Sequence, residues 1–378
     1  MQLTGIEKKQ FEQRGFSRRS FGRLATLLAA GSSLPFYNEP ALAQLSKVDD
    51  APPDAVMINA NENPMGPCPE AREAVANIIS QGGRYLFGET DRVARILAAQ
   101  EQVKPTYVQI FAGSSAPLHQ SVLAFTSPTK AFVTADPGYE AGERAARFIG
   151  AKVVRVPLTK DYAHDVKAMA AVPDAGLIYL CNPNNPTGTL TPKADIDWLV
   201  ANKPAGAVVM IDEAYTHIAG APFSTYLVAA DKDVVVLRTF SKIYGMAGLR
   251  AGAAIARPDL LDKLRGFSAG MMPITGMVAA TASLESRNLI PERRKKIAEV
   301  RSSVFSFLDQ HKFQFVASVS NCFMVDVKQP GHNVIAAMRQ EKVYIGRVWP
   351  SWPTYVRVTV GTHEEMAKFQ AAFLKVMA

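Results

Sequence analysis

The stretch VVVLRTFSKIYGMAGLRAG, residues 234–252, changes character after its fourth residue. Its first four residues are apolar and mostly β-branched, which predicts a buried strand at Val234–Leu237. A threonine, a serine and Lys242 follow the strand, and Arg250 comes eight positions later among small residues. Lys242, Arg250 and the hydroxyls of Thr239 and Ser241, all placed after a buried strand, raise the question of what they bind.

Four more apolar runs precede this stretch, with amphipathic helical segments such as Ala141–Phe148 and Lys193–Val200 between them. This alternation predicts an α/β fold with a mostly parallel sheet, in which ligands bind at the carboxyl ends of the strands. The five predicted strands are Tyr107–Ala112, Ala131–Ala135, Leu177–Cys181, Val208–Ile211 and Val234–Leu237.

Each predicted strand is followed by residues that can contact a ligand. A Gly-Ser-Ser turn at 113–115 leads into a helix, whose free N–H groups and dipole favour a phosphate. Each feature alone has an ordinary explanation, such as a helix cap, a core tyrosine or a loop. Together they converge on one site. The candidates are Ser114, Ser115, Tyr139, Asn185, Asp212, Tyr215, Thr239, Ser241, Lys242 and Arg250.

Longer motifs contain these candidates and extend along the chain. They are Asn61-Glu62-Asn63-Pro64, Arg84-Tyr85, Asn185-Pro186-Thr187-Gly188, Asp212-Glu213-Ala214-Tyr215, Ser241-Lys242 with Gly248-Leu249-Arg250, and Tyr355-Val356-Arg357-Val358. In this order they resemble aspartate-aminotransferase-like enzymes of pyridoxal-5'-phosphate (PLP) fold type I, and within them the histidinol-phosphate aminotransferase branch. The resemblance runs from about residue 59 to the C-terminus. It implies a large domain with a seven-stranded sheet between helices and a smaller α+β C-terminal domain.

The resemblance also implies how the cofactor is held. Lys242 would form a Schiff base with PLP and then carry the proton between substrate and cofactor. Asp212 would keep the pyridine nitrogen protonated, so that the ring acts as an electron sink. By the same resemblance, the cofactor phosphate would be bound by Ser114, Ser115, Thr239, Ser241 and Arg250. The cofactor ring would be contacted by Tyr139, Asn185 and Tyr215.

The substrate residues also come from the resemblance. Arg357, in an alternating strand pattern, would bind the substrate carboxylate, and Asn61 would line the substrate site. Arg347 lies near the position of an arginine that contacts the substrate phosphate in histidinol-phosphate enzymes. Tyr85 would reach the phosphate of a neighbouring subunit, which implies a homodimer with shared sites. The activity implied is transfer of an amino group from an amino acid, or an amine such as histidinol phosphate, to a 2-oxo acid.

Three features leave the substrate open. The Gly-Ser-Ser-Ala turn at 113–116 lacks the acidic pair usual in histidinol-phosphate enzymes, and Leu-Phe-Gly follows Arg84-Tyr85 in place of Pro-Asp. Trp349 and Trp352 could line a wide apolar pocket or belong to the core. A close alternative is decarboxylation of an amino-acid phosphate, since the outcome depends on which substrate bond stands perpendicular to the ring.

The first 43 residues read as a leader peptide. Basic residues precede Ser17-Arg18-Arg19-Ser20-Phe21, a short apolar run follows, and Ala41-Leu42-Ala43 forms a cleavage site. The paired arginines resemble a twin-arginine signal. The run is too short to span a bilayer, so we expect a periplasmic protein that starts near Gln44 and has no membrane contact after cleavage. The expected divisions are residues 1–43 as the leader, 44–80 as an N-terminal arm, 81–265 as the large PLP domain and 266–378 as the small domain.

Composition and motif searches disfavour other classes. The 378 residues are 48% hydrophobic and 20% charged, as in an ordinary globular chain, and the net charge of +8 includes no basic block of the kind that binds nucleic acid. Cys68, Cys181 and Cys322 match no metal-ligand spacing and are expected to be reduced and buried. Gly266 to Gly270 fits the G-x-S-x-G pattern of a serine hydrolase with Ser268 as nucleophile, but such an elbow must follow a strand and Pro258–Arg265 is helical in pattern.

Overall fold

The computed structural model describes residues 9, 12–17, 51–267 and 271–378. Most of the predicted leader, including its paired arginines and its cleavage site, lies outside the described residues. Ser268, the nucleophile of the hydrolase alternative, also lies outside them.

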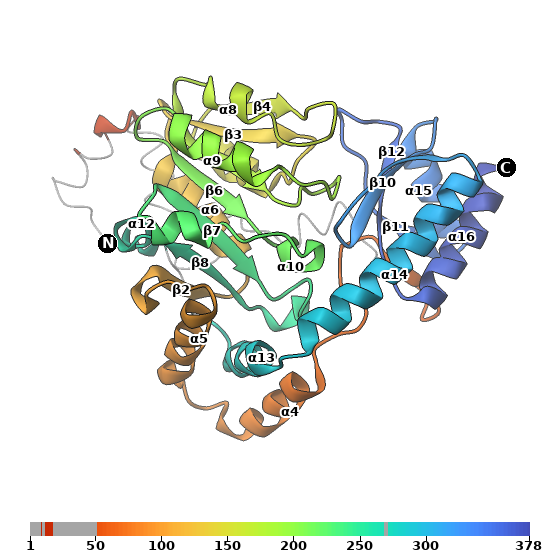
Figure 1. Cartoon of the computed structure of the whole chain (residues 1–378), viewed down its shortest axis with the longest axis horizontal. Coiled ribbons are helices and arrows are strands. Elements are labelled where there is room, and N and C mark those ends of the chain that lie inside the picture. Colours follow the sequence, from red (N-terminus) through yellow and green to blue (C-terminus); the bar gives the residue numbers. More distant parts are fainter. Residues whose placement is uncertain (1–8, 10–11, 18–50, 268–270) are drawn as a thin grey trace.

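A seven-stranded sheet forms the centre of the larger part of the molecule (Figure 1). Its order is β2-β8-β7-β6-β5-β3-β4, and the five strands from β7 to β4 are parallel while β8 runs antiparallel to β7 and β2. The predicted, mostly parallel sheet is confirmed. The strands are β2 (Val108–Phe111), β3 (Ala131–Asp136), β4 (Val153–Pro157), β5 (Ala175–Cys181), β6 (Val208–Asp212), β7 (Val234–Thr239) and β8 (Gly252–Ala256).

Every residue of β5, β6 and β7 is buried, as their continuous apolar sequences predict for central strands. Helices pack against the sheet, α6 on β5, α7 on β3 and α11 on β7. The helices of this part are α4 (Pro69–Ile78), α5 (Phe87–Gln100), α6 (Ser115–Phe125), α7 (Ala141–Phe148), α8 (Val166–Ala170), α9 (Lys193–Asn202), α10 (Thr216–Ala219), α11 (Thr225–Ala229), α12 (Pro258–Arg265) and α13 (Ile274–Glu285), with 3₁₀ turns η2 (Ile79–Gln81), η3 (Pro105–Tyr107) and η4 (Ala247–Leu249).

A smaller part follows, built on an antiparallel sheet of order β12-β10-β9 and three helices. The long α14 leads from the larger part into it (Figure 1). β1 of the predicted arm pairs in parallel with β11, so the arm is joined to the C-terminal residues. The divisions at 80 and 265 stay predictions. The elements are β1 (Val56–Ile58), β9 (Gln314–Val316), β10 (Cys322–Asp326), β11 (Val343–Ile345), β12 (Tyr355–Thr359), α14 (Leu289–Gln310), α15 (Gly331–Gln340) and α16 (His363–Met377).

Residues 12–17 dock on the end of α6. The Arg14 guanidinium donates to the carbonyls of Leu123, Ala124 and Thr126 at 2.8, 3.1 and 3.0 Å, where the last turn of a helix leaves its C=O groups without helical partners. Phe16 beside it is 5% exposed. Part of the predicted leader therefore contacts the folded chain.

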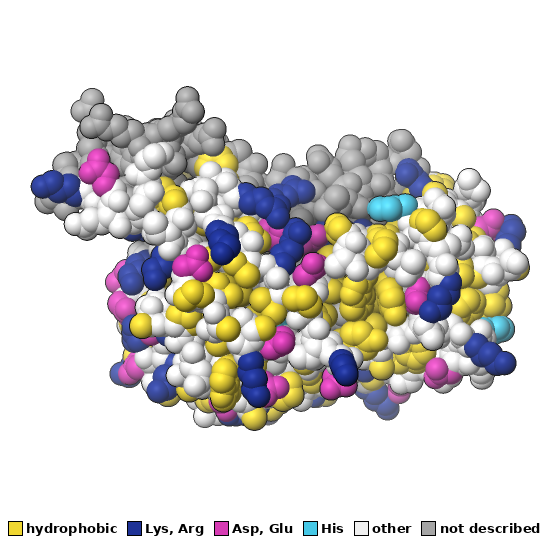
Figure 2. Space-filling view, turned by 90° about the horizontal axis from the view of Figure 1, so that it is seen from above, with side chains coloured by type: hydrophobic (Ala, Val, Ile, Leu, Met, Phe, Trp, Pro, Cys, Tyr) yellow, Lys and Arg dark blue, Asp and Glu magenta, His cyan; other side chains and the backbone are white. Residues whose placement is uncertain are grey.

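On the face in Figure 2, basic and acidic side chains are intermingled with hydrophobic ones. Among the described helices, none is both long and apolar enough to cross a membrane. All three cysteines are buried and free, as predicted.

Candidate functional site

The carboxyl ends of the central strands open onto a cavity of about 350 Å³. Such a volume suits a small-molecule ligand. Tyr85 is the one predicted site residue that the structure does not bring here, and its side chain is 71% exposed. The predicted residues that line the cavity are Asn61, Ser114, Ser115, Tyr139, Asn185, Asp212, Tyr215, Thr239, Ser241, Lys242, Arg250, Arg347 and Arg357.

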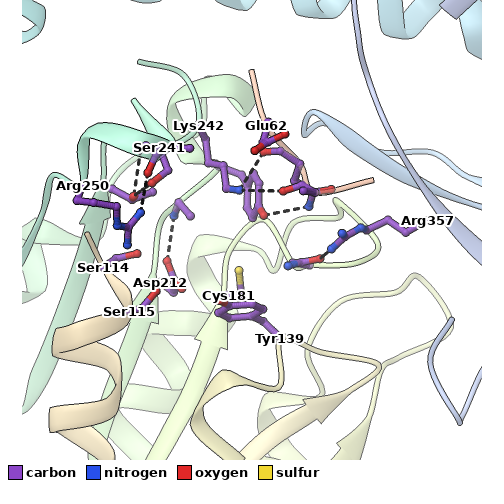
Figure 3. Close-up of a pocket in the computed structure, with 18 of the residues that line it drawn as sticks. Glu62, Ser114, Ser115, Tyr139, Cys181, Asp212, Ser241, Lys242, Arg250 and Arg357 are labelled. Carbon is purple, nitrogen blue, oxygen red and sulfur yellow. Dashed lines mark hydrogen bonds between the residues drawn. The ribbon is translucent and has the colours of Figure 1, made fainter. Parts of the chain in front are cut away.

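Lys242 points into the middle of this cavity (Figure 3). It lies three residues after the end of β7, so the parallel sheet delivers it to the same edge as Asp212 at the end of β6. Its Nζ donates to the carbonyl of Asn61 at 2.9 Å and lies 5.7 Å from the centre of the Tyr215 ring. The amine is held by the arm and faces a phenol.

Asp212 is buried and held by two donors. The Tyr179 hydroxyl donates to Oδ2 at 2.9 Å, and the Ala214 N–H donates to Oδ1 at 3.2 Å. Burial raises the pKa of Asp212 to about 6, although both hydrogen bonds oppose the rise. A buried carboxylate of this kind favours a cationic partner inside the cavity.

An anion-binding end is formed by Arg250, Ser241 and Ser114, which gather on one side in Figure 3. Thr239 Oγ1 donates to Ser241 Oγ at 3.0 Å. Arg250 has a left-handed backbone, φ +55°, and its guanidinium folds over Gly113, where a Cβ would collide with Nη2. Gly113 precedes α6, so a helix N-terminus, a guanidinium and hydroxyls share this end.

Arg357 lies at the opposite end of the cavity (Figure 3). It is 5% exposed, and its two terminal nitrogens donate to Asn185 Oδ1 at 3.0 Å and to the Asn59 carbonyl at 2.7 Å. Its Nε is buried without a hydrogen-bond partner among the described residues. Burial lowers the pKa of the guanidinium. A buried guanidinium that lines a cavity can bind an anion there.

Asn61 connects the arm to both parts of the chain. Its Nδ2 donates to Tyr215 Oη at 3.1 Å and to Cys322 Sγ at 3.2 Å, and its Oδ1 accepts from the Thr359 hydroxyl at 3.1 Å. Burial raises the pKa of Tyr215, so its hydroxyl stays protonated. Asn61 therefore positions Tyr215 and, through its carbonyl, Lys242.

Arg347 also lines the cavity, and it is paired. Its Nη2 lies 2.6 Å from Glu140 Oε2, and its guanidinium lies 4.5 Å from the Trp349 ring centre. Trp349 is 1% exposed and packs in a small apolar cluster that Trp352 joins. Trp349 is therefore a core residue, and neither tryptophan lines the cavity.

The sequence did not single out Tyr179, Glu140 or the Cys322 contact. Tyr179 lies in a continuous apolar strand and so attracts no attention in the sequence. A buried tyrosine hydroxyl needs a hydrogen-bond partner, however, and this requirement could have pointed to it. Glu140 meets Arg347 across more than 200 residues, and no local pattern encodes that pairing.

The rejected chemistries gain no structural support within the described ranges. α12, a helix and not a strand, precedes the G-x-S-x-G segment, as the pattern predicted. Residues 9, 12–17, 51–267 and 271–378 contain no group of three His, Cys, Asp or Glu that could hold a metal ion.

The known proteins that this chain resembles are aminotransferases. The family model described as "Aminotransferase class I and II" matches residues 53–373. A histidinol-phosphate aminotransferase of Moorella thermoacetica is 31% identical over 86% of this chain and 86% of its own, and an aromatic amino acid aminotransferase of Cutibacterium acnes is 33% identical over 82% and 90%. The crystal structure of histidinol-phosphate aminotransferase from Sinorhizobium meliloti in complex with pyridoxal-5'-phosphate superposes with a TM-score of 0.80, at 26% identity over 91% of this chain and 95% of that one.

Proposed function

The chain belongs to the class I and II aminotransferases, and we propose that it carries out their reaction with Lys242, Asp212 and Arg250 as its central residues. It is a PLP-dependent aminotransferase of fold type I, and it moves an amino group from a donor to a 2-oxo acid. The observation that carries the residue assignment is the convergence of these three side chains on one cavity from two adjacent strand ends and the turn after them.

The residues present fit PLP. Arg250, the hydroxyls of Thr239 and Ser241 and the N-terminus of α6 form a cradle for a phosphate dianion, and Gly113 leaves the space that the guanidinium needs. Asp212 would pair with the protonated ring nitrogen, which compensates the cost of burying the carboxylate. When bound, the cofactor supplies an electron sink for the charge left on the substrate carbon.

Lys242 performs the proton transfers. Its amine would hold the cofactor aldehyde. When it is not bound there, the same amine would be the base that takes the proton from the substrate carbon and holds it for return. The Asn61 carbonyl, which already accepts from Nζ, keeps the amine inside the cavity during this movement.

Arg357 orients the donor. Its guanidinium lines the cavity and would receive the substrate carboxylate, while Asn185 holds one of its terminal nitrogens in place. The distance between Arg357 and the anion-binding end then determines which substrate bond faces Lys242.

A Lys242→Ala variant tests this assignment. We expect turnover to fall by at least about a thousandfold, because both anchor and base are lost. The absorption band of the lysine-bound cofactor at the edge of the visible region should disappear, while some PLP stays bound at Arg250 and Asp212. Lys232→Ala is the matched control, since this exposed lysine precedes the same strand, β7, at its other end. Turnover that survives in Lys242→Ala would refute the assignment.

The unaltered, PLP-loaded enzyme can be used to distinguish transamination from decarboxylation of an amino-acid phosphate. A transaminating donor converts the cofactor from the aldehyde to the amine form and yields a 2-oxo product. A decarboxylated donor releases carbon dioxide and leaves the aldehyde form. A screen that includes histidinol phosphate would identify the donor.

We also propose a homodimer and export by the twin-arginine route. Tyr85 and Phe87 stack at 5.6 Å and are 71% and 65% exposed, which suits a contact with a second copy. The leader features of residues 1–43 support a periplasmic location. Export of the folded chain would let it collect PLP in the cytoplasm first.

A further inference from the structure

The substrate end of the cavity carries its own counter-ion. Arg347 is 8% exposed and lines the cavity, yet its guanidinium is ion-paired with Glu140 at 2.6 Å. Glu140 directly follows Tyr139 at the start of α7, and its side chain is 27% exposed. The stack on Trp349 fixes the guanidinium plane from below. Arg347 is therefore already paired with Glu140 through Nη2 before a substrate arrives.

Three charged side chains meet at this end, Arg357, Arg347 and Glu140, and together they carry one positive charge. Arg357 and Arg347 contribute two cations, both over the Trp349 ring, and Glu140 contributes one anion. The next carboxylate along α7, Glu143, is compensated by two arginines of its own. Glu62, which is exposed at the cavity wall, adds a further negative charge near the opening.

One substrate carboxylate bound to Arg357 neutralises that positive charge. A second negative group could reach Arg347 only beside the Glu140 carboxylate or by displacing it. Two like charges about 4 Å apart in a partly buried site weaken binding by about tenfold to a thousandfold. A neutral group at the same place meets no such repulsion, and Glu140 can accept a hydrogen bond from it.

We propose that Glu140 makes this site selective for amino donors with one negative charge, against donors with two such as dicarboxylic amino acids and amino-acid phosphates. The selection rests on the proposed function, because it concerns the donor of the same reaction. It also accounts for the Glu140 ion pair, which would be a disadvantage in a site built to bind a dianion.

Glutamine and glutamate test the selection because they have the same shape and differ by one charge. Single-turnover conversion of the bound cofactor to its amine form gives a second-order rate constant for each. We expect glutamine to exceed glutamate by about tenfold or more in the unaltered enzyme. Glu140→Gln should reduce that ratio by about tenfold or more, mainly by raising the glutamate value. Glu140→Ala should shift it in the same direction.

Glu143→Gln is the matched control, since it makes the same change one turn away on α7 where the partners are Arg147 and Arg155. Its glutamine-to-glutamate ratio should equal that of the unaltered enzyme. Calorimetric binding of glutarate and of its half-amide to the PLP-loaded enzyme gives a second readout that involves no turnover. The half-amide should bind more tightly, and Glu140→Gln should remove the difference.

Two outcomes would overturn the proposal. One is that the unaltered enzyme prefers glutamate to glutamine, or glutarate to its half-amide. That result would mean that Glu140 orients Arg347 to bind dianions. The other is a ratio that Glu140→Gln leaves unchanged. The proposed function would fail by a different result, namely that no donor in a wide screen that includes alanine produces the amine form of the cofactor. In that case the calorimetric comparison still tests the charge selection.

Discussion

Replacing Asp212 by Asn is expected to stabilise the PLP-free protein while weakening its hold on PLP. Asp212 is 3% exposed, and its carboxylate is held by the Tyr179 hydroxyl and the Ala214 N–H. An asparagine has the same shape, can accept from the Ala214 N–H and can donate to the tyrosine oxygen. The change therefore removes a buried charge and keeps the local contacts.

The expected magnitude follows from the pKa of Asp212. Burial raises that pKa from 3.8 to about 6. This difference corresponds to about 3 kcal/mol of free energy that the ionised group costs the fold. Because an acid with a raised pKa binds its proton more tightly in the folded state, the cost is complete above pH 6, declines as the pH falls from 6 to 4, and is absent below.

Urea unfolding of the PLP-free protein at pH 8 and pH 4 measures this effect. At pH 8 the Asp212→Asn variant should have the higher urea midpoint, and at pH 4 the two midpoints should converge. Saturating PLP should then stabilise the unaltered protein more than the variant, because only the carboxylate can pair with a protonated ring nitrogen. A variant that is less stable than the unaltered protein at pH 8 without PLP would refute the reasoning.

Three further predictions concern assembly and the leader. Mixed dimers of Lys242→Ala and Tyr85→Ala should regain about a quarter of full activity, because half of the dimers then contain one intact site; an activity no higher than the mean of the two variants would exclude shared sites. In a host with a working twin-arginine route, mass spectrometry of the periplasmic fraction should find a chain that starts near Gln44, and precursor confined to the cytoplasm would contradict export. In the uncleaved chain, Arg14→Ala removes three hydrogen bonds worth about 1–3 kcal/mol together and should speed chymotryptic cleavage in the leader, whereas Lys9→Ala, at an exposed residue, should not; equal rates would argue against docking.

The sequence predicts those strands that consist of a continuous run of apolar, strand-favouring residues. β5, β6 and β7 are continuous apolar runs, and their predicted bounds differ from the observed ones by at most two residues. β8 (GAAIA) was missed because glycine and alanine disfavour strands, and only its place between β2 and β7 makes it one. β4 was missed as a short edge strand with one buried residue.

The meeting of the proposed cofactor residues at one edge was predictable for a related reason. Lys242 and Asp212 follow predicted strands, and parallel strands bring their carboxyl ends to one edge. Asn61 shows where this reasoning stops. It lines the cavity as predicted, but the sequence gives no sign that its side chain contacts Tyr215, Cys322 and Thr359, which are 154, 261 and 298 residues away.

The two ends of the cavity therefore differ in how the sequence encodes them. The proposed PLP end is built from short segments that each carry a local signal. At the donor end, Glu140 precedes α7 and Arg347 follows β11, so their contact depends on how the smaller part packs against the larger. A single substitution at either position changes the charge offered to the donor without disturbing the cofactor cradle. Family membership shows the reaction class, and in our proposals Lys242 carries out that reaction while the Glu140–Arg347 pair determines which donors are accepted.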